Sequence, residues 1–242
     1  MAMISKTRLA ELVRAWDWKA VALGLDENPK LLEHRDPRGR NWLHLCCSID
    51  LPAHPQLDAA ASIKLAELLL ARGLGIDTPA FTEGSWQATP LWYSVSRGHN
   101  SKLAAYLLKR GCSPDHTLWA GAFNRDLAAI RMLVRHGAKI DAVTENETAF
   151  LAAVKWSHFE AAELLLELGA NVDFRDSKGM TALHYMLKKD SAKAHFAMMV
   201  RHGAHGDIPD AKGKTAAAIM HRKRDPEFRT LADRLKRGRV RP

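Results

Sequence analysis

Apolar residues recur along this chain in short blocks at helical spacing, and the blocks end at glycines. The clearest block runs from Thr148 to Asp173. A short apolar helix is expected after Thr148, followed by a longer one from Phe159, and then Gly169 and a polar turn. Two short helices cannot bury an apolar face without neighbours, so this pattern predicts one member of a row of repeats.

Four other segments align with this block on a helix-starting residue and on the glycine that ends the second helix. The anchors are 22, 21, 21 and 22 residues apart in Thr89 to Gly111, His116 to Gly137, Thr148 to Gly169 and Thr181 to Gly203. From Asn41 to Gly73 the distance is 32, and we expect the extra residues between the two helices, at 48–58, where two prolines stand. Threonine is a good N-cap, and glycine adopts the left-handed conformation that ends a helix.

Helical patterns also flank the aligned segments. Residues 8–34 mix apolar and charged positions as a cap with one solvated face requires, and a last helix start at Thr215 continues to Leu235. We therefore predict caps at both ends of a row of five repeats. The predicted ranges are 1–35 for the N-terminal cap, 36–209 for the repeats (36–77, 84–115, 116–141, 142–173 and 174–209), 210–236 for the C-terminal capping repeat, and 237–242 for a basic tail.

The repeated block resembles the ankyrin repeat, a unit of about 33 residues with a T-P-L-H motif and two helices. Close matches are Asp176-Ser-Lys-Gly179, Thr181-Ala-Leu-His184, Gly169-Ala-Asn-Val-Asp173 and Thr89-Pro-Leu91. The resemblance covers about residues 36–236. It implies an all-α repeat solenoid of about five helix-turn-helix repeats with short hairpin turns, and structural hydrogen bonds for the histidines at the motif position, His44 and His184.

Two turns depart from the regular spacing. From Gly73 to Thr89 is 16 residues, against 11 or 12 elsewhere, so this turn, which carries Phe81 and Trp86, should be long. From Gly111 to His116 is only 5 residues, and the hairpin there should be nearly absent. The short turn either leaves a notch in the row of hairpins or reflects drift in a tolerant loop.

Composition narrows the class of protein. Hydrophobic residues make up 47% of the chain and charged residues 26%, which favours a globular fold over wholesale disorder. The three cysteines, Cys46, Cys47 and Cys112, include no C-x-x-C pair, so reduced core thiols in a cytoplasmic protein are favoured over disulfides or a zinc site. Neither a signal peptide nor a membrane span is indicated.

The sequence motivates no catalytic chemistry. It holds no H-E-x-x-H, G-x-S-x-G or P-loop motif, and we expect no enzyme activity, cofactor or metal site. The net charge of +9 is concentrated near the C-terminus, where residues 210–242 carry +7. The run Lys236-Arg-Gly-Arg-Val-Arg241 is the basis of an alternative function, weak nucleic-acid binding through phosphate contacts, although it lacks interleaved aromatics for base stacking.

The resemblance implies a platform that binds a partner protein through hairpin tips and the groove side of the first helices. Counting seven and eight residues past each helix start gives the groove-facing pairs, which are Ser48/Ile49, Ser96/Arg97, Phe123/Asn124, Lys155/Trp156, Lys188/Lys189 and Arg222/Lys223. Trp156 is the favoured anchor because tryptophan is enriched in interface hot spots. The alternative is that Trp156 packs over the first helix of a neighbouring repeat, and Phe123 is open to the same two interpretations.

Charge along the predicted groove changes from mixed to basic. Glu145 and Glu147 stand on one hairpin, and lysines and arginines follow towards the C-terminus, which predicts an acidic partner segment on the last three repeats. The alternative is that these lysines only keep the surface soluble. Trp86 is either an exposed anchor or a lid on its own loop. The predicted partner-binding set is Trp86, Arg97, Phe123, Glu145, Glu147, Lys155, Trp156, Lys178, Lys188, Lys189, Arg222 and Lys223, on a chain expected to be monomeric when free.

Overall fold

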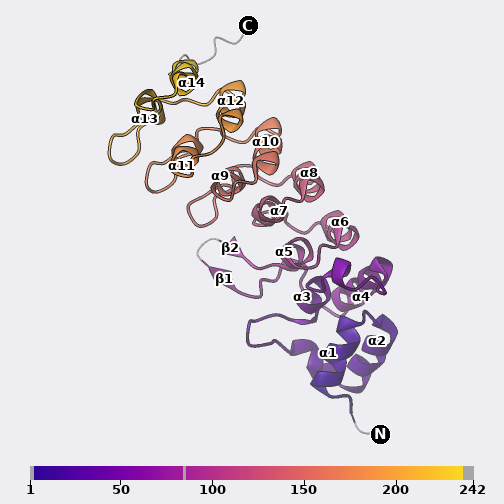
Figure 1. Ribbon diagram of the computed structural model, residues 1–242. Coiled ribbons are helices and arrows are strands. Elements are labelled where there is room, and N and C mark those ends of the chain that lie inside the picture. The colour runs from indigo at the N-terminus through magenta and orange to yellow at the C-terminus, as the bar shows by residue number, and fades with distance from the viewer. Residues whose placement is uncertain (1–2, 84–85, 237–242) are drawn as a thin grey trace. The chain divides into compact units, whose positions relative to one another are not determined.

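The computed structural model describes residues 3–83 and 86–236, and over these residues the chain forms fourteen α-helices in consecutive pairs (Figure 1). The pairs are α1 (Lys6–Arg14) and α2 (Trp18–Glu27), α3 (Trp42–Cys47) and α4 (Ala59–Ala71), α5 (Pro90–Ser96) and α6 (Ser101–Lys109), α7 (Leu118–Asn124) and α8 (Leu127–Arg135), α9 (Ala149–Lys155) and α10 (Phe159–Glu167), α11 (Ala182–Lys188) and α12 (Lys193–Arg201), and α13 (Ala216–His221) and α14 (Pro226–Lys236).

The helix signals in the sequence form as predicted. The hydroxyl oxygens of Thr89, Thr148 and Thr215 accept the N–H of the residue three positions on, at 3.2–3.3 Å. The five glycines that end second helices all have positive φ, between 77° and 101°. Such an angle strains any residue with a Cβ, which is why glycine stops these helices.

The chain divides into two compact units. Unit 1 comprises residues 1–121 and 131–138, and unit 2 comprises residues 122–130 and 139–242. In unit 1 the helices pack in two layers, with α1, α3 and α5 in one and α2, α4 and α6 in the other. Large apolar side chains such as Leu43, Leu69 and Leu107 are fully buried, and the indole N–H of Trp16 donates to the carbonyl of Cys46 at 3.1 Å.

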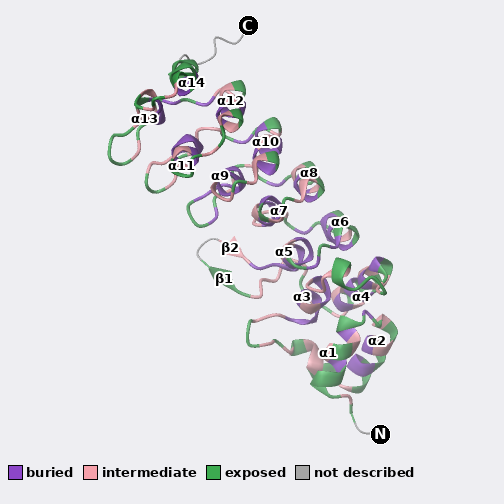
Figure 2. Cartoon of the chain, in the orientation of Figure 1, coloured by how far each residue is buried: buried purple, intermediate pink, exposed green. Residues whose placement is uncertain are grey.

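Unit 2 has the same two-layer construction. The first helices α9, α11 and α13 pack in one layer, while α12 packs on α14 in the other. Phe150 and Phe196 are fully buried. Buried residues (purple in Figure 2) occur along the helices of unit 2, so each helix pair shares an apolar core with the next. Burial of this kind, roughly 25 cal/mol per Å² of apolar surface, is what a single pair could not achieve alone.

Three of the loops that precede first helices share one construction, Asp-x-Arg/Lys-Gly. The carboxylates of Asp36, Asp176 and Asp210 each accept two backbone N–H groups, from the residues two and four positions on, at 2.8–2.9 Å. The carboxylate therefore closes the loop, and the basic residue at its tip points away from the core. These tip residues, Arg38, Lys178 and Lys212, are all exposed.

The irregular turns also lie where the spacing predicts them. The long turn before α5 carries a two-stranded antiparallel ribbon, β1 (Thr82–Glu83) with β2 (Trp86–Gln87). The extra residues 48–58 separate α3 from α4 and contain one 3₁₀ turn, Leu51–Ala53, while another, Pro29–Glu33, follows α2. A short loop joins α6 to α7.

Cys46, Cys47 and Cys112 are buried free thiols, as predicted, and burial raises the pKa of Cys112 to about 12. Burial removes a thiol from reagents and disfavours its thiolate, so these residues serve packing. No helix within residues 3–83 and 86–236 is long and apolar enough to cross a bilayer.

Candidate functional site

Unit 1 contains a cavity of about 670 Å³ beside the first helices. We call it the arginine-aromatic cavity; it is lined by Arg38, Arg40, Ser48, Phe81, Trp92, Tyr93 and Arg97. The loop before α3 supplies two arginines, the long turn before α5 supplies Phe81, and α5 with its C-cap supplies the rest except Ser48, the C-cap of α3. Arg97 and Ser48 are both positions that the repeat register predicts to face the groove.

An aromatic cluster forms one wall of this cavity. Phe81 lies 5.2 Å from Trp86, Trp86 lies 4.9 Å from Trp92, and Trp92 lies 5.0 Å from Tyr93 between ring centroids, each pair edge to face. Phe81 remains 41% exposed, whereas Trp86 is half-buried between its neighbours. Trp86 therefore packs as a lid over its own loop, and Phe81 is the ring that faces outward.

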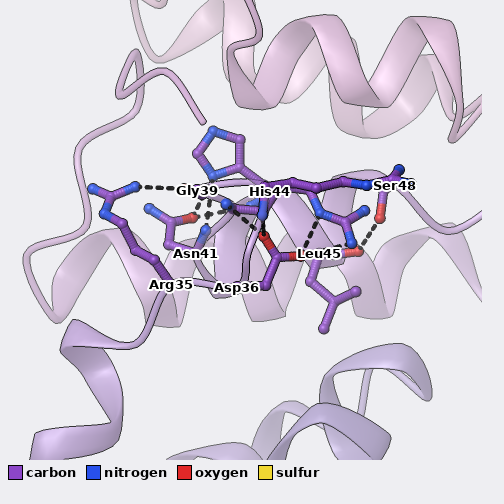
Figure 3. Close-up of polar contacts among 9 residues, drawn as sticks. Arg35, Asp36, Gly39, Asn41, His44, Leu45 and Ser48 are labelled. Atoms are coloured by element: carbon purple, nitrogen blue, oxygen red, sulfur yellow. Dashed lines mark hydrogen bonds and ion pairs between the residues drawn. The ribbon is translucent and has the colours of Figure 1, made fainter. Parts of the chain in front are cut away.

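Of the arginines that line the cavity, Arg40 forms an ion pair with a carboxylate. Arg40 donates from its Nε to the Oδ2 of Asp36 at 2.7 Å and lies over the Tyr93 ring at 5.9 Å. Figure 3 shows this loop, in which Arg35 also donates to the carbonyl of Gly39 at 3.0 Å. Burial would raise the pKa of Asp36, but the hydrogen bonds from the Arg40 side chain and the loop backbone outweigh it and the pKa is lowered. Asp36 is thus an ionised, fully occupied carboxylate.

Arg38 and Arg97 have no such partner: in the described part of the chain, neither guanidinium has a carboxylate within ion-pair distance. Both side chains are exposed. Burial raises the pKa of the Tyr93 hydroxyl, and four nearby charges act on it. In order of strength these belong to Arg40, Asp36, Arg38 and Arg97. The three guanidinium groups and the Tyr93 side chain therefore line the same cavity.

In unit 2 the predicted anchor Trp156 is the C-cap of α9 and is half-buried. Its ring meets Phe123 of α7 edge to face, with 4.9 Å between centroids, and lies 6.2 Å from His158. The alternative interpretation of Trp156, packing over a neighbouring first helix, is thus what the structure shows. Phe123 is the more accessible partner, 48% exposed, so the pair presents Phe123 outward and Trp156 as its support.

The surroundings of Lys155 and Glu147 correct a prediction. Glu147 was expected at a hairpin tip but is only 7% exposed, and its carboxylate pairs with the ammonium of Lys155. Lys155 in turn lies 5.3 Å from the ring centroid of Tyr185, and its carbonyl accepts a hydrogen bond from Lys189. The tight turn explains this, because Glu147 pairs with Thr144 and directs its side chain back to α9. Glu145 and Asn146 are the exposed residues of that tip.

Four of the predicted basic residues of unit 2 are exposed and form no ion pair with any residue of the described chain: Lys178, Lys188, Lys189 and Arg222. Lys189 donates to the carbonyl of Lys155, which leaves three exposed cations, Lys178, Lys188 and Arg222. Lys223 differs, because it pairs with Asp190 at 2.9 Å and lies over the Phe228 ring at 4.3 Å. We call the three exposed cations, together with Phe123 and Trp156, the basic face. Residues 237–242, the predicted basic tail, lie outside the described residues.

Comparison with known proteins gives the fold its family. A family model described as ankyrin repeats, in three copies, matches residues 117–210. The solved ankyrin repeat domain of Bcl-3 aligns with 93% of this chain and 97% of its own, with a TM-score of 0.72 and 18% identity. Residues 117–210 of this chain are ankyrin repeats, and the chain has the ankyrin-repeat fold. The human ASB11 ankyrin repeat domain has the same fold, with a TM-score of 0.68, 18% identity and coverage of 96% of this chain and 99% of that one.

Curated ankyrin-repeat relatives match only part of this chain. Phosphocholine transferase AnkX of Legionella pneumophila is 31% identical over 140 residues, which cover 53% of this chain and 14% of AnkX. Human ankyrin repeat and SOCS box protein 11 is 28% identical over 123 residues, covering 48% of this chain and 37% of that protein. The chain thus spans well under half the length of these relatives. Ankyrin repeats are generally protein-protein interaction modules, and the fold is typically a non-enzymatic scaffold.

Within the ankyrin repeats, the motif histidine His184 has the structural role that the resemblance implied. Nδ1 of His184 accepts a hydrogen bond from the backbone N–H of Thr181, with 3.1 Å between the nitrogens. Nε2 of the same ring lies 3.0 Å from the carbonyl oxygen of Lys214 in the next hairpin. His44 accepts the N–H of Asn41 at its Nδ1, 3.2 Å away, but its Nε2 is buried and has no hydrogen-bond partner among the described residues, so the predicted bond to the neighbouring turn forms only at His184.

The sequence did not indicate Arg38, Arg40, Phe81 or Tyr93 as site residues. A signal for the two arginines was present, since the Asp-x-Arg/Lys-Gly pattern of 36–39 recurs at 176–179 and 210–213 and places a cation at each tip. No comparable signal marked Phe81 or Tyr93, because their role depends on how the long turn folds over α5.

Proposed function

We propose that this chain is a non-enzymatic module that binds an acidic segment of a partner protein and thereby acts as an adaptor, inhibitor or regulator. The observation that carries the proposal is the basic face of unit 2. Lys188 ends α11 and Arg222 caps α13, at the register position that Lys155 holds at the end of α9. Because α9, α11 and α13 pack in one layer, these equivalent ends follow one another along one side of it.

Two carboxylates of this region, those of Asp176 and Asp210, are already engaged in hydrogen bonds of their own loops. Asp176 accepts two backbone N–H groups and the Tyr185 hydroxyl, and Asp210 accepts two backbone N–H groups. Lys178 therefore stands at its hairpin tip without a carboxylate to neutralise it. A row of such cations attracts an acidic segment and speeds its association, while contributing less to the final affinity.

Phe123 and Trp156 supply the apolar contact that charge alone does not give. The exposed half of Phe123 offers a surface against which a partner side chain can be desolvated, and the edge-to-face contact with Trp156 holds that surface rigid. Aromatic anchors surrounded by weaker polar contacts are the usual energetic pattern of a protein interface. The buried free thiols support a reducing compartment, and we place this binding in the cytoplasm, by a free chain that is monomeric.

The test first captures a partner protein and then measures the affinity of that partner for purified variants of this chain. Partners cross-linked to the wild type are identified, expressed and titrated against a triple reversal, Lys178→Glu, Lys188→Glu and Arg222→Glu. We expect binding to weaken more than tenfold and its dependence on salt to flatten, because three cations facing the acidic segment are replaced. The variant Phe123→Ala should mainly raise the dissociation rate.

A matched control reverses the same number of charges on the exposed side of α6 in unit 1, through Lys102→Glu, Lys109→Glu and Arg110→Glu. This control should leave the affinity within about twofold. Equal loss in both triple variants would show that only net charge matters and would refute the basic face. A further variant ends at Leu235 and therefore lacks the basic tail. If this variant loses partner binding, and also loses the nucleic acid that the wild type retains, the basic tail is the functional element and nucleic-acid binding replaces this proposal.

A further inference from the structure

The arginine-aromatic cavity of unit 1 differs in kind from the basic face. On the basic face each cation stands apart at a tip or a helix end, whereas Arg38, Arg40 and Arg97 line one shared volume that is open to solvent and has aromatic walls. A volume of about 670 Å³ lies within the range of roughly 300–1,000 Å³ that is usual for binding sites. Convergence on a shared volume points to a compact ligand.

The charge of the cavity specifies the charge of that ligand. Three guanidinium groups line it and Asp36 supplies one carboxylate, so the local charge is +2. Asp36 is committed to Arg40 and to its own loop, which leaves Arg38 and Arg97 to face a ligand. A phosphate monoester carries about −1.5 to −2 at neutral pH, and guanidinium groups bind its oxygens through paired hydrogen bonds. A single carboxylate would neutralise only half of this site.

The aromatic walls of the cavity indicate which chemical group carries the phosphate. Phe81, Trp92 and Tyr93 present ring surface next to the arginines, and Phe81 is the most exposed of them. Aromatic rings pack well on such walls, edge to face or offset. Among the described residues that line the cavity there is no carboxylate or amide side chain, and the hydroxyl of Ser48 already donates to the Leu45 carbonyl at 2.9 Å. The amino groups of a nucleotide base would find few acceptors there, whereas a phenyl ring needs none.

We propose that the arginine-aromatic cavity binds a phosphotyrosine side chain of a partner protein. Arg38 and Arg97 hold the phosphate, Arg40 adds positive charge while Asp36 fixes its direction, and the ring packs beside Phe81. This site adds a phosphorylation-dependent contact in unit 1 to the acidic-segment contact proposed for unit 2. It rests on the proposed function only in requiring that the ligand belongs to a protein.

The test uses the full chain and synthetic probes, so that its result is independent of partner capture. A neutral glycine-serine peptide carrying one phosphotyrosine is titrated by fluorescence anisotropy, and phenyl phosphate and AMP compete for the site. We expect saturable one-to-one binding of the phosphopeptide, no binding of the tyrosine peptide, and competition by phenyl phosphate at lower concentration than AMP. Arg38→Gln and Arg97→Gln should each weaken binding at least tenfold, because each removes a hydrogen bond between charged groups.

Arg110→Gln is the matched control, since it removes one exposed arginine of unit 1 outside the cavity and should leave affinity unchanged. Phe81→Ala should weaken the phosphotyrosine peptide severalfold and leave a phosphoserine peptide unaffected. The proposal is overturned if the phosphoserine peptide binds as tightly as the phosphotyrosine peptide, if AMP outcompetes phenyl phosphate, or if Arg110→Gln weakens binding as much as Arg97→Gln. Far-UV circular dichroism of each variant confirms that the fold is intact before titration.

Discussion

The arginine-aromatic cavity and the basic face are built from the same parts but arranged differently. Both combine a cation at the tip of an Asp-x-Arg/Lys-Gly loop with aromatic residues near the ends of first helices. In unit 1 these groups converge on one volume. In unit 2 Phe123 and Trp156 pack on each other, and Lys155 turns inward to Glu147, so the remaining cations stand apart.

The length of one turn accounts for much of the difference. The turn before α5 is long enough to form a β-ribbon, and this ribbon places Trp86 against Trp92 of α5 and Phe81 against Trp86. The turn before α9 is tight, closed by Thr144 and Glu147, and has no residues to spare for such a wall. A repeat therefore fixes where its helices lie, whereas the turn decides whether neighbouring side chains enclose a volume or line a surface.

The largest expected effect tests whether the two regions share their loop construction. Asp36→Ala and Asp176→Ala should each lower the free energy of unfolding by about 2–4 kcal/mol, because each leaves two backbone N–H groups without their acceptor and strands a side chain, Arg40 or Tyr185. Urea denaturation of both variants measures the losses. Similar losses are expected; a large loss in only one would show that the shared sequence pattern hides different loops.

The second effect concerns the pH dependence of stability that follows from His44, whose pKa differs between the folded and the unfolded chain. Burial lowers the pKa of His44 from 6.5 to about 4, so the folded chain keeps it neutral while the unfolded chain protonates it below pH 6.5. Because the unfolded state then binds more protons, stability present above pH 6.5 is lost as the pH falls through about 4. Between pH 7 and pH 5 this amounts to about 2 kcal/mol.

Denaturation curves of the wild type and His44→Gln at these two pH values isolate the histidine from other titrating groups. The variant should lose about 2 kcal/mol less than the wild type over the same interval. Histidine proton resonances followed by NMR provide a measurement that does not depend on a variant, since one ring should titrate near pH 4. An unaltered acid slope in His44→Gln would show that another group destabilises the fold.

The repeat architecture could be predicted because it rests on local signals. Thr148 and Gly169 mark a helix start and a helix stop by their own backbone chemistry, and the same pair of anchors recurs in register. The site could be predicted only in part. The register predicts that Arg97 faces the groove, because counting along a helix fixes where a backbone position lies, and Arg97 lines the arginine-aromatic cavity.

Side-chain partners are not fixed by that count, and there the sequence was insufficient. Glu147 was assigned to a tip but turns back to Lys155, and Trp156 packs on Phe123, because each finds a favourable contact supplied by another helix. Phe81 was noted only as part of a long turn. Its place in a cavity wall depends on how the adjacent ribbon packs on Trp92 of α5, a side-chain contact that the repeat spacing does not specify.

The third effect concerns the aromatic support of the basic face. A double-mutant cycle of Phe123→Ala and Trp156→Ala should give a coupling of about 1 kcal/mol in the free energy of unfolding, the usual value for an edge-to-face pair. A control cycle pairs Phe123→Ala with Phe228→Leu, whose ring contacts Phe196 instead, and its coupling should be near zero. Zero coupling in both cycles would show that Trp156 does not hold Phe123 in place.

The smallest effect on stability separates the two regions most sharply by function. Arg38→Gln and Lys178→Gln alter equivalent loop tips, and both side chains are exposed, so each should change the free energy of unfolding by no more than about 0.5 kcal/mol. Their effects on binding should not be interchangeable. Arg38→Gln should weaken the phosphotyrosine peptide and spare the acidic partner, while Lys178→Gln should slow association with the acidic partner, most at low salt, and spare the phosphopeptide. If either variant weakens both ligands equally, the cavity and the basic face act as one undivided positive surface, and the turn before α5 has no specific part in recognition.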